Sequence, residues 1–358
     1  MLVAPLDWGL GHATRCIPII RELVSQGVEV VVAADGRPFD LLKKEFPLLT
    51  FVRLPGYSVS YPNDKRIAAK VVRQLPQLAY SAMSEHRMLQ KIIRDFGVQA
   101  VISDSRFGLF ARGIPSAYVS HQIGIKMPPS LEWASYFIYL VNKALINRYS
   151  ECWIPDTAGK DNLSGELSHH YPLPHNAKYI GPLSRFKRIS GIVKEYDVLV
   201  LLSGPEPQRS ILENIVLDQL KASPYRSLVV RGVPEKTQQI KLSDLVTVVS
   251  SLESEALNVA ILSAEVVLSR PGYSTVMDLA VLGSRAIFIP TPGQTEQEYL
   301  AEIFLKNGTF CIRRQEGFDL DEAIKEARQR PGIGFDAPLG PQLHDVVREF
   351  VARIPETD

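Results

Sequence analysis

The 358-residue sequence has few cysteines, almost no net charge and no long hydrophobic run. Its three cysteines, Cys16, Cys152 and Cys311, are odd in number and far apart, which argues against a disulfide framework and a cysteine-ligated metal site. No segment reaches the roughly 18 uninterrupted apolar residues of a membrane-spanning helix, and the N-terminus lacks the basic and apolar regions of a signal peptide. We therefore expect a cytoplasmic protein, with the inner face of the membrane as a candidate location.

The net charge of +1 argues against a protein built mainly to coat nucleic acid, and we expect no nucleic-acid partner. The charges are not evenly spread, however. Residues 1–187 hold 22 Lys+Arg and 15 Asp+Glu, whereas residues 188–358 hold 18 and 24. The resulting +7 and −6 fit either a chance division of solvated surface or a basic N-terminal domain that meets an anionic partner, such as phospholipid headgroups or a pyrophosphorylated acceptor.

One apolar segment, residues 126–148, combines aromatic and aliphatic side chains with flanking cations. A helix lying on a membrane surface has this composition. A core helix with basic ends has it too, and the pattern slightly favours the core helix.

Short β-branched runs alternate with helical periodicities along the whole chain, which predicts two α/β domains built on parallel, Rossmann-like sheets. A stretch containing Gly, Pro and Ser, residues 181–191, is the predicted linker. We expect an N-terminal domain over residues 1–187, a C-terminal domain over 188–340, and a helix within 341–358 that could pack back on the N-terminal domain.

A glycine turn follows the first predicted strand, in the sequence Asp-Trp-Gly-Leu-Gly-His of residues 7–12. Such a turn lets backbone N–H groups approach an anion. A dinucleotide-binding fingerprint would need glycine in place of Thr14 and has no use for a histidine, although Asp35 would suit a ribose diol. We therefore predict that His12 is an acid/base or hydrogen-bonding group in a cleft, the alternative being a solvated helix start.

Two more loops of the first half follow predicted strands. Asp104 is the second candidate base, with Arg106 either shifting its pKa or binding an acceptor phosphate, and the alternative is an Asp–Arg pair that ties loops together. His121 could act as a base or as an orienting donor. The predicted acceptor-binding residues are Arg15, Arg106, His121 and Gln122.

The second half contains a sharper motif, Ser-Arg-Pro-Gly-Tyr-Ser-Thr-Val-Met-Asp over residues 269–278. A strand, a glycine turn and a helix beginning at Ser274 would offer free N–H groups and hydroxyls to a diphosphate. Asp278, one turn further on the same face, could accept from both ribose hydroxyls, although an ordinary capped helix would look similar. The polar loop 291–299 should line the same crevice.

These two motifs, in this order, resemble the GT-B nucleotide-sugar glycosyltransferases, most of all the branch containing the peptidoglycan UDP-N-acetylglucosamine transferase MurG. That family has a Gly-x-Gly-His turn after its first strand, a Ser-Arg-x-Gly-x-x-Thr-x-x-Glu stretch, and a Gln-Gln-Tyr helix start. Here Asp278 replaces the Glu, Glu298 replaces a Gln, and the family's Gly-Gly-Ser turn appears only as Ser203-Gly204-Pro205. The resemblance implies two Rossmann-like domains facing across a cleft.

The resemblance also implies an activity: transfer of a sugar from a nucleotide-sugar, expected to be UDP-linked, to a hydroxyl of a glycan, lipid-linked or small-molecule acceptor of the cell envelope. The expected reaction inverts the anomeric centre and needs neither a metal nor a cofactor beyond the nucleotide-sugar. A nucleotide-sugar hydrolase or epimerase and a non-catalytic nucleotide-sugar-binding protein are the alternatives. The implied catalytic residues are His12 and Asp104, and the implied donor-binding residues are Gly11, Arg185, Ser203, Gly204, Arg270, Gly272, Ser274, Thr275, Asp278, Gln294, Glu296, Gln297 and Glu298.

Two other clusters could suggest a metal. His169, His170 and His175 lie in a proline-rich segment that is better explained as a solvated loop. Asp319 begins a D-x-D sequence, but it precedes a predicted helix, where it is a good N-cap. We predict no metal site.

Overall fold

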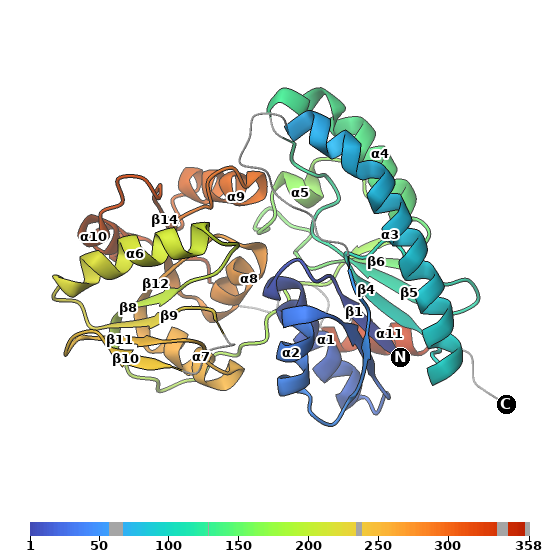
Figure 1. Cartoon of the computed structure of the whole chain (residues 1–358), viewed down its shortest axis with the longest axis horizontal. Helices are drawn as coiled ribbons and strands as arrows, with labels where there is room; N and C mark the ends of the chain where they lie inside the picture. The colour runs from blue at the N-terminus through green and yellow to red at the C-terminus, as the bar shows by residue number, and fades with distance from the viewer. Residues whose placement is uncertain (57–66, 128, 234–237, 335–342, 355–358) are drawn as a thin grey trace. The chain divides into compact units, whose positions relative to one another are not determined.

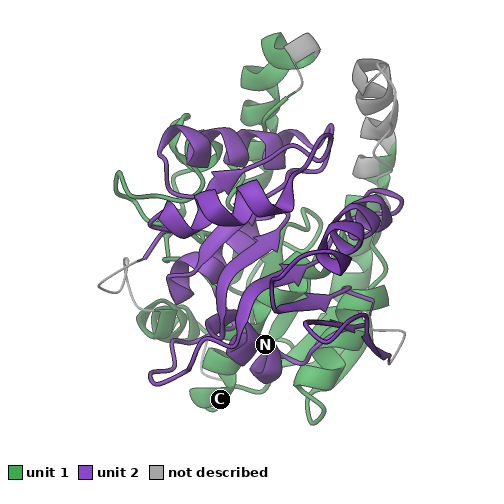
Figure 2. Cartoon of the chain, turned by 90° about the vertical axis from the view of Figure 1, so that its left-hand side faces the viewer, with its two compact units in different colours: residues 1–183, 337–358 green, residues 184–336 purple. Residues whose placement is uncertain are grey.

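The computed structural model describes residues 1–56, 67–127, 129–233, 238–334 and 343–354. The chain divides into two compact units: residues 1–183 with 337–358, called unit 1, and residues 184–336, called unit 2 (Figure 2). The boundary lies four residues before the linker position predicted at 187/188. Each unit is an α/β domain around one mainly parallel sheet, so the predicted fold class is confirmed.

Unit 1 contains a seven-stranded sheet in the order β3-β2-β1-β4-β5-β6-β7, with every pair parallel. Figure 1 labels its strands β1, β4, β5 and β6. Most of its strands are buried along their full length, as expected where helices cover both faces of a parallel sheet. Its elements are β1 (Leu2–Pro5), α1 (Leu10–Ser25), β2 (Val31–Ala34), α2 (Gly36–Glu45), β3 (Thr50–Arg53), α3 (Ile67–Phe96), β4 (Val101–Asp104), β5 (Ser116–Val119), the 3-10 helix η1 (Pro129–Ala134), α4 (Ser135–Ile146), β6 (Glu151–Ile154), α5 (Glu166–His169), β7 (Ala177–Tyr179) and α11 (Leu343–Val351).

The C-terminal helix α11 belongs to unit 1, although it follows unit 2 in the sequence. Its Phe350 packs edge-to-face on Trp153 of β6, with ring centroids 5.2 Å apart. The carbonyl of His344 accepts from Gln26, the C-cap of α1, at 3.0 Å, and the ring Nδ1 of His344 lies 2.7 Å from Glu22 of α1. The last helix therefore completes the core of the first domain.

Unit 2 contains a second seven-stranded sheet, in the order β10-β11-β9-β8-β12-β13-β14. All its pairs are parallel except β10 with β11. Its elements are β8 (Tyr196–Leu201), α6 (Gln208–Lys221), β9 (Ser227–Val230), β10 (Gln239–Lys241), β11 (Val246–Val249), α7 (Ser254–Leu262), β12 (Ala264–Ser269), α8 (Tyr273–Leu282), β13 (Arg285–Phe288), α9 (Thr295–Lys306), β14 (Cys311–Ile312) and α10 (Leu320–Gln329).

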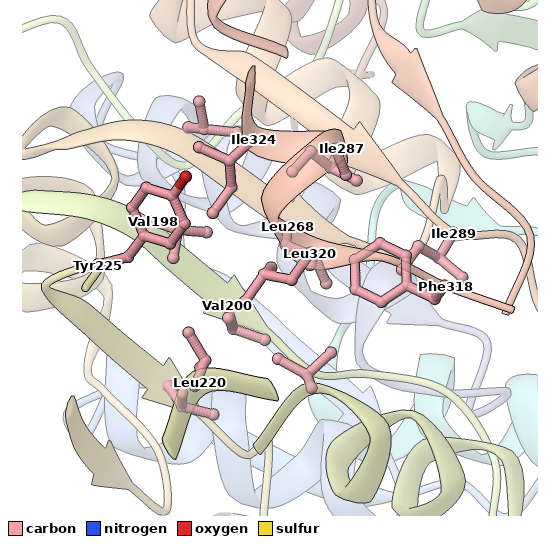
Figure 3. Packing of buried hydrophobic residues seen from close by; sticks show 14 of the residues in the cluster. Val198, Val200, Leu220, Tyr225, Leu268, Ile287, Ile289, Phe318, Leu320 and Ile324 are labelled. Carbon is pink, nitrogen blue, oxygen red and sulfur yellow. The ribbon is translucent and has the colours of Figure 1, made fainter. Parts of the chain in front are cut away.

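A dense apolar core joins the second sheet to its helices (Figure 3). Val200 of β8, Leu268 of β12 and Ile287 of β13 meet Leu220 of α6 and Ile324 of α10, and all five are fully buried. This packing fixes the strand ends, from which the loops of the candidate site start.

Both sheets place a topological switch point beside their first strand. In unit 1 the chain moves outward from β1 to β3 and then returns to β4, so the loops after β1 and β4 diverge. In unit 2 the corresponding strands are β8 and β12. Ligands of open α/β sheets bind at such switch points, outside the carboxyl ends of the strands.

The charge separation expected from the sequence is smaller across the structural boundary. Unit 1 holds 22 Lys+Arg and 19 Asp+Glu, a net +3, and unit 2 holds 18 and 20, a net −2. The larger values of +7 and −6 arose because the acidic C-terminal segment was counted with the second half, and Arg185 and Lys187 with the first.

The helix α4 partly agrees with the core helix that the sequence slightly favoured. Tyr139, Asn142 and Ile146 are buried, as in a core helix. The opposite face of α4 and the end of η1, however, expose large apolar side chains that we call the α4 stripe: Trp133 of η1 (83% exposed) and, on α4, Tyr136 (59%), Phe137 (68%), Leu140 (43%) and Val141 (45%). Among the described residues, no helix is long and apolar enough to cross a membrane.

Candidate functional site

The switch point of unit 1 brings together the two residues predicted as alternative bases. Gly9 has φ +103°, a conformation that glycine readily adopts, and it turns the chain after β1 so that His12 lies in the first turn of α1. Asp104 ends β4, the neighbouring strand. The Nδ1 atom of His12 lies 2.7 Å from Oδ1 of Asp104, and the carboxylate is fully buried whereas the imidazole side chain is 20% exposed. His12 and Asp104 therefore form a hydrogen-bonded pair.

Arg15 is the third member of this cluster. Its side chain is 3% exposed, and its guanidinium donates to both oxygens of Asp104. The same guanidinium lies 3.0 Å from Nδ1 of His121 and 3.0 Å from Nδ1 of His12, and it donates to Ser105 Oγ at 3.0 Å. The sequence analysis predicted that Arg15 binds the acceptor, but in this structure its guanidinium is hydrogen-bonded to other side chains of unit 1.

The charges around Asp104 decide its protonation. Burial alone would raise the pKa of its carboxyl, but the charge and hydrogen bonds of Arg15, with those of His12, outweigh burial and hold the pKa well below its usual range. Asp104 is therefore a poor proton acceptor at neutral pH. This geometry favours His12 over Asp104 as the base.

Arg106 does not act on Asp104 or point at an acceptor, which corrects the sequence prediction. It is fully buried, and its Nε donates to Glu85 of α3 at 2.9 Å. Its other nitrogens donate to the carbonyls of Pro5, Leu54 and Pro55, at 3.3, 3.1 and 2.8 Å. Arg106 is therefore a structural residue whose hydrogen bonds connect the ends of β1 and β3 to α3.

The remaining predicted acceptor residues follow β5. His121 is 6% exposed and lies against Arg15. Gln122 donates its backbone N–H to Ser120 and accepts at its carbonyl from Asn142 of α4, at 3.1 and 3.0 Å. The structure thus places His121 in the cluster and Gln122 at the junction with α4.

The switch point of unit 2 has a different character. Gly272 leads from β12 into α8, and the first intrahelical bond runs from Val276 N to the carbonyl of Gly272 at 2.9 Å. Ser274 and Thr275 lie in the first turn, where backbone N–H groups have no partner inside the helix. Helix N-termini of this kind favour phosphate groups.

Asp278 lies one turn into α8, as predicted. Its Oδ1 accepts a 2.6 Å hydrogen bond from Ser184, a residue that sequence analysis missed because it lies 94 positions away. Burial raises the pKa of Asp278 to about 6, although the nearby charge of Arg185 and the Ser184 hydrogen bond act to lower it. Arg185 itself donates to Ser254 Oγ at 3.2 Å and stacks on Phe186. These residues form a carboxylate site beside the α8 N-terminus.

Arg270 is not exposed to a ligand, which corrects its prediction as a donor contact. It is 1% exposed and donates to the carbonyls of Ile289, Pro290 and Gln208, at 2.9, 3.0 and 3.0 Å, and to the amide oxygen of Gln315. No carboxylate of the described residues pairs with it, and burial lowers the pKa of Arg270 to about 10. Its charge therefore lies behind the site, joining the ends of β12 and β13 to α6.

The loop after β13 is fixed by the helix it opens. Gln297 accepts at Oε1 from the Thr291 backbone N–H, and Glu298 accepts from that of Gly293, both at 2.8 Å. Gln294 is the N-cap of α9 and Glu296 lies in its first turn. Gln297 and Glu298 thus shape this loop with one side-chain oxygen each, a role the sequence did not predict.

Two glycines complete the predicted set. Gly204, after β8, has φ +104°, and a Cβ there would lie 3.8 Å from the buried Oγ1 of Thr291, so this turn and the loop after β13 approach closely. Ser203 precedes it. Gly11 lies in unit 1 beside His12, apart from the other predicted donor residues, all of which belong to unit 2.

The described residues contain no group of three or more His, Cys, Asp or Glu side chains that could hold a metal ion. His169 is occupied by the carbonyls of Thr157 and Gly165 and stacks on Tyr179. Asp319 accepts from the Glu322 N–H at 2.9 Å, which confirms it as an N-cap.

The sequence of this chain is similar to those of glycosyltransferases. A family model, the glycosyltransferase family 28 C-terminal domain, matches residues 209–332. An uncharacterized glycosyltransferase of Methanosarcina acetivorans is 22% identical over 329 residues, covering 82% of this chain and 78% of the relative. A 63-residue stretch, 17% of this chain and 18% of the relative, is 41% identical to the UDP-N-acetylglucosamine–N-acetylmuramyl-(pentapeptide) pyrophosphoryl-undecaprenol N-acetylglucosamine transferase of Buchnera aphidicola.

Solved structures agree on the fold. The glycosyltransferase SnogD from Streptomyces nogalater is similar with a TM-score of 0.63 at 13% identity, and 98% of each chain is covered. MurG from Acinetobacter baumannii is similar with a TM-score of 0.54 at 15% identity, again over 98% of each chain. Both solved structures share the two-domain α/β architecture of this chain.

Proposed function

We propose that this chain, a glycosyltransferase of the GT-B type that resembles the MurG branch, transfers a sugar from a nucleoside diphosphate sugar to an acceptor hydroxyl. One observation carries the proposal: His12, whose side chain is 20% exposed, is hydrogen-bonded at 2.7 Å to a buried, ionised Asp104 at a sheet switch point. A histidine held in this way can remove a proton from a hydroxyl. The family 28 match over residues 209–332 supports a sugar nucleotide as the other substrate.

The donor is assigned to unit 2. The N-terminus of α8, with Ser274 and Thr275, would hold the diphosphate, and the Asp278 carboxylate would accept from the ribose hydroxyls. Gln297 keeps its amide nitrogen for a sugar hydroxyl while its oxygen holds the loop. Uridine is the first choice of nucleoside because the Buchnera relative is named for a UDP-linked donor.

The proposed reaction is a single displacement. The acceptor oxygen bonds to the anomeric carbon as its proton passes to Nε2 of His12, and the bond from that carbon to the diphosphate oxygen breaks, with its electron pair leaving on the diphosphate. Attack opposite the leaving group inverts the anomeric centre. The N-terminal dipole of α8 stabilises the departing charge, so no metal is required for this step.

The acceptor is assigned to unit 1, together with a peripheral membrane contact through the α4 stripe. Trp133 and Phe137 are 83% and 68% exposed, and residues 121–150 contain the cations Lys126, Lys143 and Arg148 and one carboxylate, Glu132. Lys126 pairs with Glu166, which leaves Lys143 and Arg148 as the cations of the helix itself and its end. Aromatic side chains with flanking cations suit the interface of an anionic bilayer. A cytoplasmic protein that acts at the inner membrane face on a lipid-linked acceptor of the cell envelope fits this surface.

Vesicle sedimentation tests the membrane contact. We expect the chain to bind vesicles of phosphatidylcholine with phosphatidylglycerol, and Trp133→Ser with Phe137→Ser to abolish binding. Leu48→Ser is the matched control, because Leu48 is 97% exposed in unit 1 outside the stripe. Equal binding of all variants would exclude the stripe as the contact, and failure of the unsubstituted chain to bind would exclude the contact itself.

A thermal-shift screen tests the donor. UDP should raise the melting temperature more than dTDP, ADP or NAD, since a ligand at one hundred times its Kd stabilises by about 2.7 kcal/mol. UDP-sugars that stabilise the chain are then incubated without acceptor. Fast, stoichiometric release of free sugar would identify a hydrolase, and a shift with NAD alone would exclude a sugar nucleotide as substrate.

A further inference from the structure

The basic side chain nearest the candidate base is Arg15, one helical turn beyond His12 on α1. It is 3% exposed, and its nitrogens reach Asp104, Ser105 and both His12 and His121. A side chain so enclosed is poorly placed to bind an acceptor in this structure. Its contacts instead determine where protons lie on its neighbours.

The first consequence concerns His12. Arg15 holds two oxygens of Asp104, so the carboxylate is ionised and has no proton to donate. Asp104 Oδ1 and His12 Nδ1 are nevertheless only 2.7 Å apart, which requires a proton on Nδ1. The lone pair of the neutral ring is then on Nε2. The 3.0 Å approach of Arg15 Nη2 to His12 Nδ1 is therefore a close contact rather than a hydrogen bond.

The second consequence concerns His121. Arginine is always a donor, so the 3.0 Å contact between Arg15 Nη1 and His121 Nδ1 requires a lone pair on that nitrogen. The proton of the neutral His121 ring is then on Nε2. One guanidinium thus gives the two histidines opposite tautomers.

We propose that Arg15 is a positioning residue that makes His12 the base of this enzyme, by keeping the Asp104 carboxylate as an obligatory acceptor and by fixing His12 and His121 in opposite tautomers. The proposal rests on the proposed function only where turnover is concerned, since the tautomers follow from the contacts of unit 1 alone. It also decides between the two candidate bases, because a carboxylate clamped at both oxygens does not take the acceptor's proton.

Among the described residues, three side chains of α1 contact the Asp104 carboxylate: Arg15, His12 and Cys16. Arg15 links it to Ser105 after β4 and to His121 after β5. Arg15 is the permanent cation among them. An Arg15→Gln variant would lack the positive charge that offsets the effect of burial on Asp104. The pKa of Asp104 would therefore rise. A protonated Asp104 donates to His12 Nδ1, which moves the ring proton to Nε2 and removes the lone pair that accepts the substrate proton.

Histidine tautomers can be read directly by long-range ¹H–¹⁵N correlation on ¹⁵N-histidine-labelled protein, with signals assigned from His12→Gln and His121→Gln. At a pH where both rings are neutral, the unsubstituted chain should show the Nδ1–H tautomer for His12 and the Nε2–H tautomer for His121. In Arg15→Gln, provided that its melting curve shows a folded chain, His12 should shift towards Nε2–H. The Nε2–H form of His12 in the unsubstituted chain would overturn the proposal, whatever the activity.

Kinetics separate positioning from acceptor binding. Arg15→Gln should lower kcat by about 10²–10³-fold with little change in the acceptor KM, and should move the acidic limb of the kcat profile to higher pH. Arg15→Lys should recover part of the lost kcat, because the ammonium keeps the positive charge. It cannot contact both oxygens of Asp104 and His121 at the same time, so the recovery should be incomplete. Arg106→Lys is the control, a buried arginine two residues from Asp104 whose loss should lower the melting temperature without moving the pH profile.

A double-mutant cycle completes the test. Because Arg15 acts through Asp104, adding Arg15→Gln to Asp104→Asn should cost far less than Arg15→Gln alone. Additive losses, or a raised acceptor KM with unchanged kcat, would overturn the proposal and restore Arg15 to the acceptor site. If no UDP-sugar is turned over by the unsubstituted chain, the proposed function fails while the tautomer measurement still decides the role of Arg15.

Discussion

The six parallel strands of unit 2 follow the same order as the first six strands of unit 1, yet the switch points of the two units hold different kinds of side chain. In unit 1 the strand ends carry a buried cluster of fixed charge and imidazole: His12, Arg15, Asp104 and His121. In unit 2 they carry a helix N-terminus with Ser274 and Thr275, and one carboxylate whose pKa is raised to about 6.

Under the proposed function, the difference separates two tasks. A permanently ionised carboxylate that orients an imidazole suits proton transfer. Free N–H groups and hydroxyls suit an anion that must bind and leave. The buried arginines follow the same division: Arg15 faces the reacting groups of unit 1, whereas Arg270 of unit 2 is turned into the framework.

The largest expected effect comes from His12→Ala. Turnover should fall by about 10²–10⁴-fold, because the base of unit 1 is lost, while UDP affinity should stay unchanged, because the donor binds unit 2. The control is His344→Ala, an exposed histidine of the same unit that pairs with Glu22 and should leave turnover intact. Full turnover by His12→Ala would remove the division of tasks.

Replacing the two buried arginines Arg106 and Arg270 should lower the free energy of unfolding by different amounts. Arg106→Met leaves Glu85 buried without its cation and should destabilise by about 3–5 kcal/mol, with a smaller deficit at acidic pH, because burial already raises the pKa of Glu85. Arg270→Met leaves only carbonyls and the Gln315 amide unpaired and should cost about 1–3 kcal/mol. Denaturant unfolding measures both. A larger cost for Arg270→Met would mean that its lone charge is stabilised by a group other than these acceptors.

Asp278 should make unit 2 sensitive to pH. Its pKa is about 6 in the folded chain and ordinarily 3.8, so the folded state retains a proton that the unfolded state has lost, and stability falls as pH rises from about 4 to 6. Asp278→Asn should therefore melt about 6–12 °C higher above pH 6, because about two pKa units correspond to about 3 kcal/mol, with the difference vanishing towards pH 4. Asp218→Asn, an exposed carboxylate of unit 2, is the control. A constant difference at every pH would contradict the raised pKa.

The smallest effect is expected at Asp319, a carboxylate of unit 2 with a purely structural role. Asp319→Ala removes the N-cap of α10 and should cost about 1 kcal/mol of unfolding free energy without altering UDP affinity. Calorimetric melting and UDP titration measure the two quantities. A change in UDP affinity would extend the donor site to α10.

Local patterns in the sequence were sufficient for the fold and for the positions of His12, Asp104 and Ser274 within it. Each lies where a strand ends and a loop or helix begins, which hydrophobic runs and glycines mark. The edge strand β10 escaped notice because all three of its residues are exposed and its sequence, Gln-Ile-Lys, has no apolar run.

Pairing across the sheet could not be predicted. Arg106 is two residues from Asp104 and seemed its natural partner, but its side chain points to Glu85, and Arg15, 89 residues away, holds the carboxylate. Ser184 and Asp278 meet across 94 residues for the same reason. Composition alone also could not tell which face of α4 is buried, since both faces are apolar.

The central claim, that unit 2 binds the nucleotide and unit 1 supplies the base, is tested most directly by calorimetric titration of UDP into the unsubstituted chain, His12→Ala and Asp278→Ala. The account predicts equal affinity for the first two and at least a tenfold loss for Asp278→Ala, as expected for a hydrogen bond to a charged group worth about 1.5–3 kcal/mol. Loss of UDP binding in His12→Ala with normal binding in Asp278→Ala would contradict it.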